Sequence, residues 1–211
     1  PMLFQLGEPR GNPDRALPDY VQRHQLTNLV DRVGASDSNL FPVPAQAAAV
    51  PIDEIASAAG AIGHLNAAPD VDGSIRTEPL VIRYYDQFYP SFSMMLAATS
   101  LNLKPQDIEV RLGEGVALGR LAIGTDPYLQ MYTYFYQGSD GRPAFQVDSF
   151  YDVASGRIPA AKYRDKIGLI GATAAYGLAL AAHEDASDSG LASAGKALVA
   201  ARPTAVNLFW A

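Results

Sequence analysis

The sequence contains no cysteine among its 211 residues. This absence excludes a disulfide framework, a thiolate nucleophile and any metal site with cysteine ligands. Cysteine-free domains occur in reducing and in oxidising compartments, so the compartment stays open.

The chain also lacks an excess of basic residues. Sixteen lysines and arginines stand against twenty-two aspartates and glutamates, which gives a net charge of -6 and a pI near 5.0. A protein that binds nucleic acid needs a basic stripe to neutralise phosphates, and none is present. We therefore expect no nucleic-acid partner.

Long hydrophobic runs are missing as well. The longest stretch of low charge, residues 167–182, is rich in glycine and alanine and is shorter than the roughly twenty apolar residues that a membrane helix needs. The sequence starts at Pro1 within the apolar segment MLFQL, without a signal peptide. We expect a fragment that lacks any flanking transmembrane helices.

No known catalytic arrangement appears in the sequence. It has no G-x-S-x-G elbow, and none of its three histidines lies near a nucleophile and an acid in an obvious pattern. The acidic pairs Asp53–Glu54 and Glu184–Asp185 are typical of solvated positions. We predict that this chain is not an enzyme.

Helical and strand-like patterns alternate along the chain. Helical spacing of apolar residues covers residues 19–33 and 51–59, turn-forming residues fill 34–44, and Ser91 is suited to cap a third helix. Strand patterns cover residues 61–67, a hairpin over 75–89, 108–112, 129–137 and 166–171. The order predicts an α/β fold, with a mixed central sheet flanked by helices in one domain spanning 1–211.

Two dense motifs carry a resemblance to a known family. The first reads GHLNAAPDVDGSIRTEPL and the second DVASGRIPAAKYRDKIGLIGATA. Their segments, together with a YPS helix start and an aromatic strand end, follow in one order: Gly63–Asn66, Pro69–Arg76, Pro79–Leu80, Tyr89–Ser91, Tyr136–Gly138, Asp152–Gly156 and Lys166–Ala174. This combination, which spans 41–174 and more loosely 2–14, resembles the type-2 CHASE domain, a sensory module of bacterial cyclases, histidine kinases and Ser/Thr kinases.

The two ends of the chain depart from the family pattern. From Tyr176 onward, the aspartate, T-P and H-A-N features of the family are absent. Residues 191–210 instead resemble the helix and strand that the family places before the segment corresponding to Met2. We therefore expect a permuted or segment-joined domain in which residues 190–211 pack next to residues 1–14.

The resemblance implies a module on the periplasmic or extracellular face of the bacterial inner membrane, anchored by flanking helices. Such a module binds a small ligand of unknown identity and regulates a cytoplasmic nucleotide cyclase, histidine kinase, Ser/Thr kinase or diguanylate cyclase. A homodimer is compatible with this role. Two alternatives stay open: a free periplasmic solute-binding protein and a small α/β hydrolase.

Five residues are candidates for ligand contacts. His64, on an apolar strand, fits a hydrogen-bonded core histidine better than a ligand or a pH sensor. Arg76 could hold an anion, although ion pairs with nearby carboxylates are favoured. Tyr132 and Tyr134 belong to an alternating row that forms either a packed sheet face or a stacking wall. Thr173 follows a predicted strand end, where ligands gather in open α/β sheets.

The motifs do not support a metal or a cofactor. Asp70, Asp72 and Gly73 look like the opening of a calcium loop, but the position that should hold its closing glutamate is Val81. A structural turn is therefore expected there. The glycines Gly168 and Gly171 lack the spacing of a dinucleotide or phosphate loop.

Overall fold

A computed structural model describes residues 1–11, 16–67 and 69–168 of the chain. Its contacts divide the chain into two units, Pro1–Phe135 and Tyr136–Ala211.

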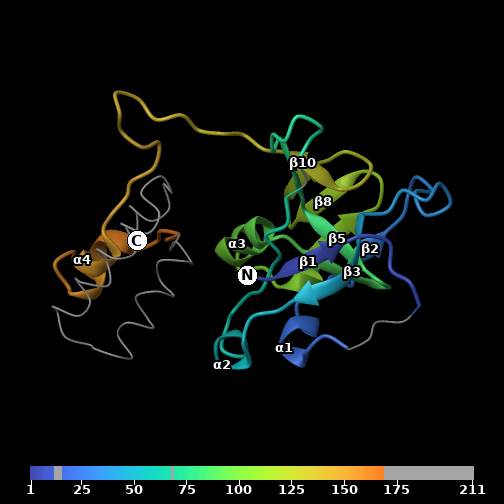
Figure 1. The fold of residues 1–211 in the computed structure, drawn as a ribbon, viewed down its shortest axis with the longest axis horizontal. Helices are drawn as coiled ribbons and strands as arrows, with labels where there is room; N and C mark the ends of the chain where they lie inside the picture. The colour runs from blue at the N-terminus through green and yellow to red at the C-terminus, as the bar shows by residue number, and fades with distance from the viewer. Residues whose placement is uncertain (12–15, 68, 169–211) are drawn as a thin grey trace. The chain divides into compact units, whose positions relative to one another are not determined.

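The first sheet of unit 1 mixes parallel and antiparallel strands in the order β1-β3-β5-β6 (Figure 1). Its strands are β1 (Leu3–Leu6), β3 (Val43–Ala49), β5 (Val81–Tyr84) and β6 (Gln87–Pro90). β3 runs parallel to β5 and antiparallel to β1. β5 and β6 form the predicted hairpin, in which Tyr84 pairs with Gln87 across a two-residue turn.

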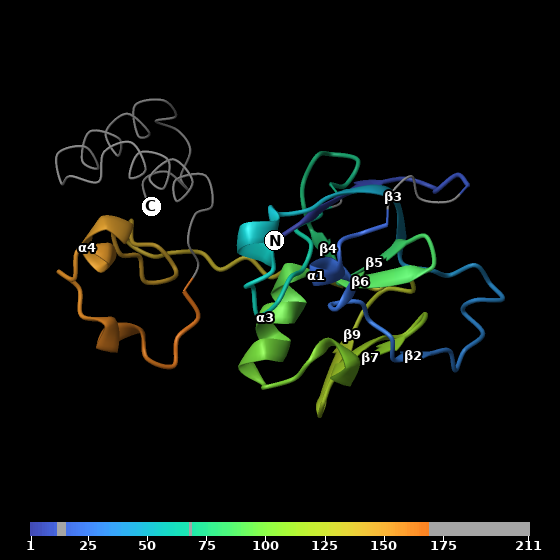
Figure 2. The ribbon, with the colours of Figure 1, turned by 90° about the horizontal axis from the view of Figure 1, so that it is seen from below.

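The second sheet has the order β2-β7-β8-β9 (Figure 2). Its strands are β2 (Leu29–Val30), β7 (Ile108–Arg111), β8 (Gly115–Leu118) and β9 (Leu121–Gly124). The predicted alternation holds in β7, where Ile108 and Val110 are buried and Glu109 and Arg111 are partly exposed. The predicted turn follows, with Gly113 at a positive φ of 76°.

A short ribbon of two antiparallel strands completes the β structure of unit 1. It consists of β4 (Thr77–Pro79) and β10 (Gln130–Tyr132), with Thr77 opposite Tyr132. β4 leads directly into β5, so the ribbon is attached to the first sheet through Leu80.

The helices of unit 1 are short. They are α1 (Asp19–Gln22), α2 (Asp53–Ala56), α3 (Phe92–Ser100) and the 3₁₀ turn η1 (Pro105–Asp107). The predicted cap of α3 is confirmed, since the Ser91 hydroxyl accepts a hydrogen bond from the Met94 N–H at 3.2 Å.

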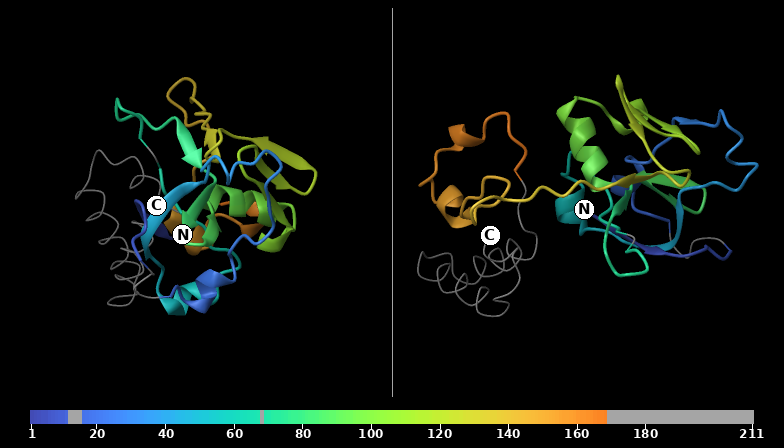
Figure 3. Two further views of the ribbon diagram at one scale, coloured as in Figure 1. Left: turned by 90° about the vertical axis from the view of Figure 1, so that its right-hand side faces the viewer. Right: turned by 90° about the horizontal axis from the view of Figure 1, so that it is seen from above.

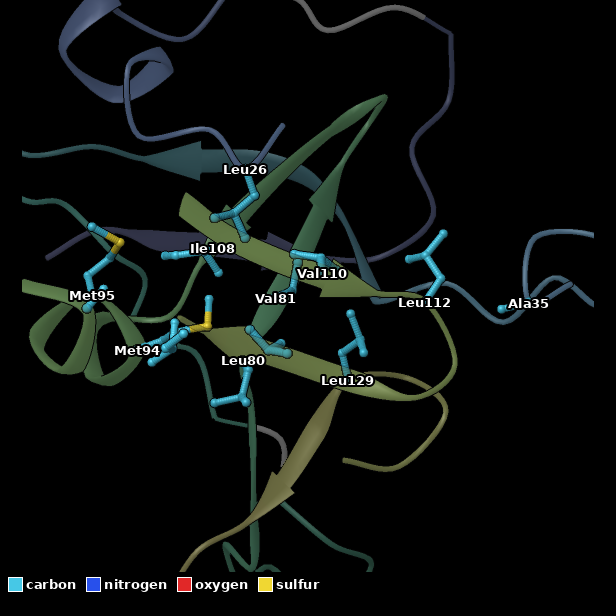
Figure 4. Close-up of a cluster of buried hydrophobic side chains, with 13 residues drawn as sticks. Leu26, Ala35, Leu80, Val81, Met94, Met95, Ile108, Val110, Leu112 and Leu129 are labelled. Carbon is cyan, nitrogen blue, oxygen red and sulfur yellow. The ribbon is translucent and has the colours of Figure 1, made fainter. Parts of the chain in front are cut away.

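Two clusters of buried apolar side chains hold unit 1 together. The larger cluster joins the two sheets and α3: Met94 and Met95 lie beside Leu80 and Ile108 (Figure 4). The smaller cluster gathers residues of β1, β3, the β5–β6 hairpin, α1 and α2, Tyr84 among them. Each fully buried side chain of this size contributes about 1.5–3 kcal/mol to the free energy of folding.

The described part of unit 2 contains α4 (Phe150–Ala154) and the 3₁₀ turn η2 (Ala160–Tyr163), drawn in orange in Figure 3. Its best-connected side chain is Asp148, which accepts hydrogen bonds from Lys162 at 2.7 Å and from Tyr163 at 2.8 Å. These donors lower the pKa of Asp148.

The α/β class with mixed sheets is confirmed, but several element predictions are not. The helix predicted over 19–33 ends at Gln22, and β2 occupies part of the remainder. Leu26 N–H donates to Phe88 at 2.8 Å, and the Asn28 carbonyl accepts from Val110 at 2.9 Å. Strand partners therefore take the backbone groups that a helix would have used, although the apolar spacing suited a helix.

Three strand predictions are longer than the strands found. Of residues 61–67, only His64 forms isolated β-bridges. Of residues 129–137, only Gln130–Tyr132 form β10, whose partner β4 begins at Thr77. Of residues 166–171, the described residues 166–168 have no regular structure, and Ile167 is 62% exposed where a buried strand was predicted. No described strand supplies these residues with backbone partners.

The predictions about the C-terminal end fall outside the described residues. These are the remainder of the 166–171 strand, the helix and strand of 191–210, and their packing next to residues 1–14. They stay predictions, as does the organisation of 1–211 as one domain.

Candidate functional site

His64 lies in an extended segment that links β1 to the start of α3. Its N–H donates to the Pro90 carbonyl at 3.0 Å, and its own carbonyl accepts from Phe92 at 2.8 Å. On the other side, the Met2 N–H donates to the Gly63 carbonyl and the Leu65 N–H donates to the Met2 carbonyl, both at 3.0 Å. We call this three-stranded crossing, formed by residues 2–4, 63–66 and 90–92, the His64 junction.

Gly63 permits the close approach at the His64 junction. A Cβ atom at this position would lie 2.6 Å from the backbone nitrogen of Phe92 and 2.6 Å from the Ser91 carbonyl oxygen. These distances are shorter than any real contact, so the junction needs a residue without a side chain at position 63.

The imidazole of His64 is buried in an apolar environment. Its side chain is 1% exposed and meets the Phe4 ring edge-on, with ring centroids 6.1 Å apart. Neither ring nitrogen has a hydrogen-bond partner among the described residues. Burial therefore lowers the pKa of His64 to about 3, and the ring is neutral at physiological pH.

Asn66 closes the other end of the His64 junction. Its side-chain amide donates to the Phe4 carbonyl at 2.7 Å, and its Oδ1 accepts from the Phe4 N–H at 2.9 Å. The side chain thus occupies both backbone groups of Phe4, as a neighbouring strand would.

A chain of polar side chains connects the His64 junction to the β4–β10 ribbon. The Ser91 and Ser93 hydroxyls lie 2.9 Å apart, and Ser93 donates a short hydrogen bond to the Glu78 carboxylate on β4. Ser91 also pairs with His64 through the backbone, so hydrogen bonds connect the ribbon to the junction.

Arg76 is held in place by two carboxylates at the end of the ribbon that lies away from Leu80. Its guanidinium donates to Asp70 at 2.6 Å and to Asp72 at 2.6 and 3.0 Å. These bonds lower the pKa of Asp72 to about 2 and raise that of Arg76. The turn itself is confirmed by the bond from Gly73 N–H to the Asp70 carbonyl at 2.8 Å. The carboxylates of the D-x-D-G motif thus serve an ion pair in a structural turn.

Two of the predicted tyrosines lie next to Arg76. Tyr132 pairs with Thr77, and the Thr133 N–H donates to the Arg76 carbonyl at 2.8 Å. The side chains of Tyr132 and Tyr134 are 81% and 78% exposed. The end of the ribbon therefore presents two exposed aromatic rings and a guanidinium on neighbouring backbone.

The structure pairs the backbone of Arg76 with Thr133, the residue between Tyr132 and Tyr134, and places His64 in a separate, buried junction. Thr173 lies outside the described residues. Sequence reasoning missed the roles of Asn66, Glu78 and Ser93, which are visible only once distant segments are paired. For Asn66 the available signal was its place in the GHLN motif, directly after the buried histidine.

Other features of the described residues do not add a site. No group of histidine, aspartate and glutamate side chains there could hold a metal ion. Depressions along β1–β3 and β8–β9 are shallow and open, and no described candidate residue lines them. None of the described helices is long and apolar enough to cross a membrane.

Curated proteins are similar to parts of the chain. Methylthioribose-1-phosphate isomerase of Methylorubrum populi is 65% identical over 43 residues, which are 20% of this chain and 12% of that protein. An uncharacterized protein in the petC 3' region of Rhodospirillum rubrum is 67% identical over 43 residues, 20% of this chain and 23% of that protein. The isomerase of Methylocella silvestris is 42% identical over 92 residues, which cover 38% of this chain and 25% of that protein. The chain thus spans a quarter or less of each of these relatives.

No solved structure matches the chain. The family comparison is more extensive, because the model of the CHASE2 domain matches residues 2–182. This range includes the His64 junction, the ribbon and both motifs on which the resemblance was based. The chain belongs to the CHASE2 domain family, the sensory domains of signalling receptors.

Proposed function

We propose that the chain is the sensor module of a bacterial transmembrane receptor. It lies on the periplasmic or extracellular face of the inner membrane, and flanking helices in the intact protein anchor it. It binds a small ligand and regulates a cytoplasmic nucleotide cyclase, histidine kinase, Ser/Thr kinase or diguanylate cyclase. The match to the CHASE2 domain over residues 2–182 is the observation that carries this proposal.

The ligand contacts lie at the end of the ribbon, around Arg76, Tyr132 and Tyr134. Exposed aromatic rings offer a large contact area at little cost in conformational entropy. An anionic ligand would have to compete with Asp70 and Asp72 for the Arg76 guanidinium. We include His64 and Thr173 among the proposed ligand-binding residues. His64 is included because hydrogen bonds connect its junction to the ribbon.

The Glu78–Ser93–Ser91 chain supports a route for the signal. A ligand shifts an equilibrium between two arrangements only through its different affinity for them. A ligand that displaces β4 would move Glu78 and, through its hydrogen bond to Ser93, the start of α3. The His64 junction would then respond to the state of the ribbon.

A thermal-shift screen of metabolites and inorganic ions on the 211-residue chain tests the proposal. A ligand of the native state raises the melting temperature by mass action. The shift should disappear in Tyr132→Ala and persist in Tyr128→Ala, which removes another exposed tyrosine. A flat response of both this chain and the intact receptor would overturn ligand sensing and assign the domain a structural role.

The membrane anchor is tested by the intact gene. Apolar segments of about twenty residues beside this region support the receptor. Their absence favours a free periplasmic solute-binding protein. The isomerase similarity covers 12% of the Methylorubrum populi protein, so we expect the chain to show no turnover of a ribose phosphate.

A further inference from the structure

The outer edge of β9 is open among the described residues. β9 is the last strand of its sheet and pairs only with β8. Its four residues include no proline and no charged side chain, and its register is regular, without a bulge. Natural proteins block unwanted strand pairing with prolines, charged side chains and bulges on edge strands, and β9 has none of these. Figure 3 shows the β8–β9 hairpin, in yellow-green, at the margin of unit 1.

The hydrogen-bond pattern tells which backbone groups of β9 face outward. In an antiparallel ladder, residues bond alternately to one neighbour and to the other. Thr125 N–H donates inward to the Glu114 carbonyl, and Leu121 closes the two-residue hairpin opposite Leu118. By alternation, the N–H and C=O groups of Ala122 and Gly124 point away from β8.

We propose that this edge pairs antiparallel with the same edge of a second copy of the chain. The twofold axis passes through Ile123, so that Ala122 of each copy exchanges two hydrogen bonds with Gly124 of the other. This inference goes beyond the proposed sensory function and does not depend on it, since it concerns the unliganded protein.

Charge complementarity selects this register among those that the outward groups allow. With Ala122 opposite Gly124, Arg120 in the hairpin turn of each copy comes next to Asp126, which follows β9 in the other copy, and this gives two opposite-charge pairs. If Ala122 met Ala122, Arg120 would lie beside Gly124, and if Gly124 met Gly124, Arg120 would lie beside Tyr128. The Asp126 carboxylate is already fixed by the N–H groups of Tyr128 and Gln130, at 3.0 and 2.8 Å.

The pairing also continues the apolar core across the twofold axis. Ile123 packs partly against the larger buried cluster, and Leu121 on the same face of the strand is 51% exposed. In the dimer, the two Ile123 side chains meet and each Leu121 lies opposite Thr125. The edge is short, so the interface belongs to the small, weak class and the dimer depends on concentration.

Cysteine cross-linking in the full 211-residue chain tests the register directly, because the natural sequence has no cysteine. In Ile123→Cys, the two thiols face each other in a non-hydrogen-bonded pair with Cα atoms about 4.5 Å apart, within the range for a disulfide. In the matched Leu121→Cys variant, the two cysteines lie four positions apart along the strand, about 13 Å. Oxidation should give at least about ten times more dimer for Ile123→Cys.

A second measurement does not rely on cysteine. Ala122→Pro removes one outward N–H per copy and is tolerated at a strand edge. In sedimentation equilibrium, we expect its dissociation constant to rise at least about tenfold, from two lost hydrogen bonds. Circular dichroism checks that it is folded. Equal cross-linking at positions 121 and 123, or a wild-type chain that stays monomeric at millimolar concentration, overturns the proposal and leaves ligand sensing untouched.

Discussion

The two sheets of unit 1 end in edges of opposite character. The outer edge of β1 is covered by residues 63–66, and the Asn66 side chain occupies both backbone groups of Phe4. The outer edge of β9 has no such cover among the described residues. Within one unit, the β1 edge is thus sealed next to a buried histidine, and the β9 edge is open next to exposed residues.

The difference has a local origin in the sequence. The segment GHLN provides a glycine for close approach, a neutral ring for the buried position and an amide that copies a strand. β9 provides only apolar and small residues, which neither cover nor repel a partner. The sealed edge is therefore expected to matter for stability, and the open one for association.

The largest expected effect breaks the sealed edge through Gly63→Ala. The new Cβ would overlap backbone atoms of Ser91 and Phe92, which cannot move independently of α3. We expect the free energy of unfolding to fall by about 3 kcal/mol in urea denaturation. Gly60→Ala is the matched control, because nothing lies within 4 Å of a Cβ there. Equal stability of the two variants would contradict the close packing.

A smaller effect follows from the buried His64 ring. Its pKa is about 3 when folded and near 6.5 when unfolded, so the unfolded state binds the proton first as the pH falls. The stability that a neutral His64 allows is complete above pH 6.5 and is lost below it. By about pH 4.5 the loss from this residue is about 2–3 kcal/mol.

His64→Leu isolates the contribution of that ring. The variant should lose less stability between pH 7 and about pH 4.5, and the difference from wild type reports His64 alone. His24 remains in both proteins, and burial lowers its pKa in the same direction. Identical pH profiles of wild type and variant in thermal unfolding would show that His64 is hydrated or paired.

The smallest of the three effects belongs to Asn66→Ala. It leaves the N–H and C=O of Phe4 without the two side-chain bonds, and we expect a loss of about 1–2 kcal/mol. Asn66→Asp keeps the acceptor and removes the donor, so its stability in the same denaturation series should be intermediate. A loss below the error for Asn66→Ala would mean that water replaces the amide.

The sequence supported the fold class and the elements whose signals are local. The turn at Gly73 and the cap at Ser91 were predictable because their hydrogen bonds join near neighbours. The alternation of β7 was predictable because apolar Ile108 and Val110 alternate with polar residues in the sequence itself. β3 was missed because its sequence, VPAQAAA, has no clear alternation; β1 and β5 on its two sides make it a strand. The prediction of a helix over 19–33 was wrong for the same reason, because distant strands pair with residues in its second half.

The candidate site shows the same division. Arg76 and its carboxylates lie within seven residues, and the ion pair was favoured from sequence. The neighbourhood of Arg76 and Tyr132 depends on the pairing of β4 with β10, which local sequence could not reveal. The burial of His64 was expected, whereas the lack of a partner for either ring nitrogen among the described residues was not.

Amide hydrogen exchange at two protein concentrations tests the contrast between the edges most directly. The account predicts that Phe4 and Leu65 are protected equally at low and high concentration, because chain segments of the same molecule cover them. Ala122 and Gly124 should exchange rapidly in dilute solution and become protected as the concentration rises. Protection of Ala122 and Gly124 that does not change with concentration would contradict it, as would rapid exchange of Phe4.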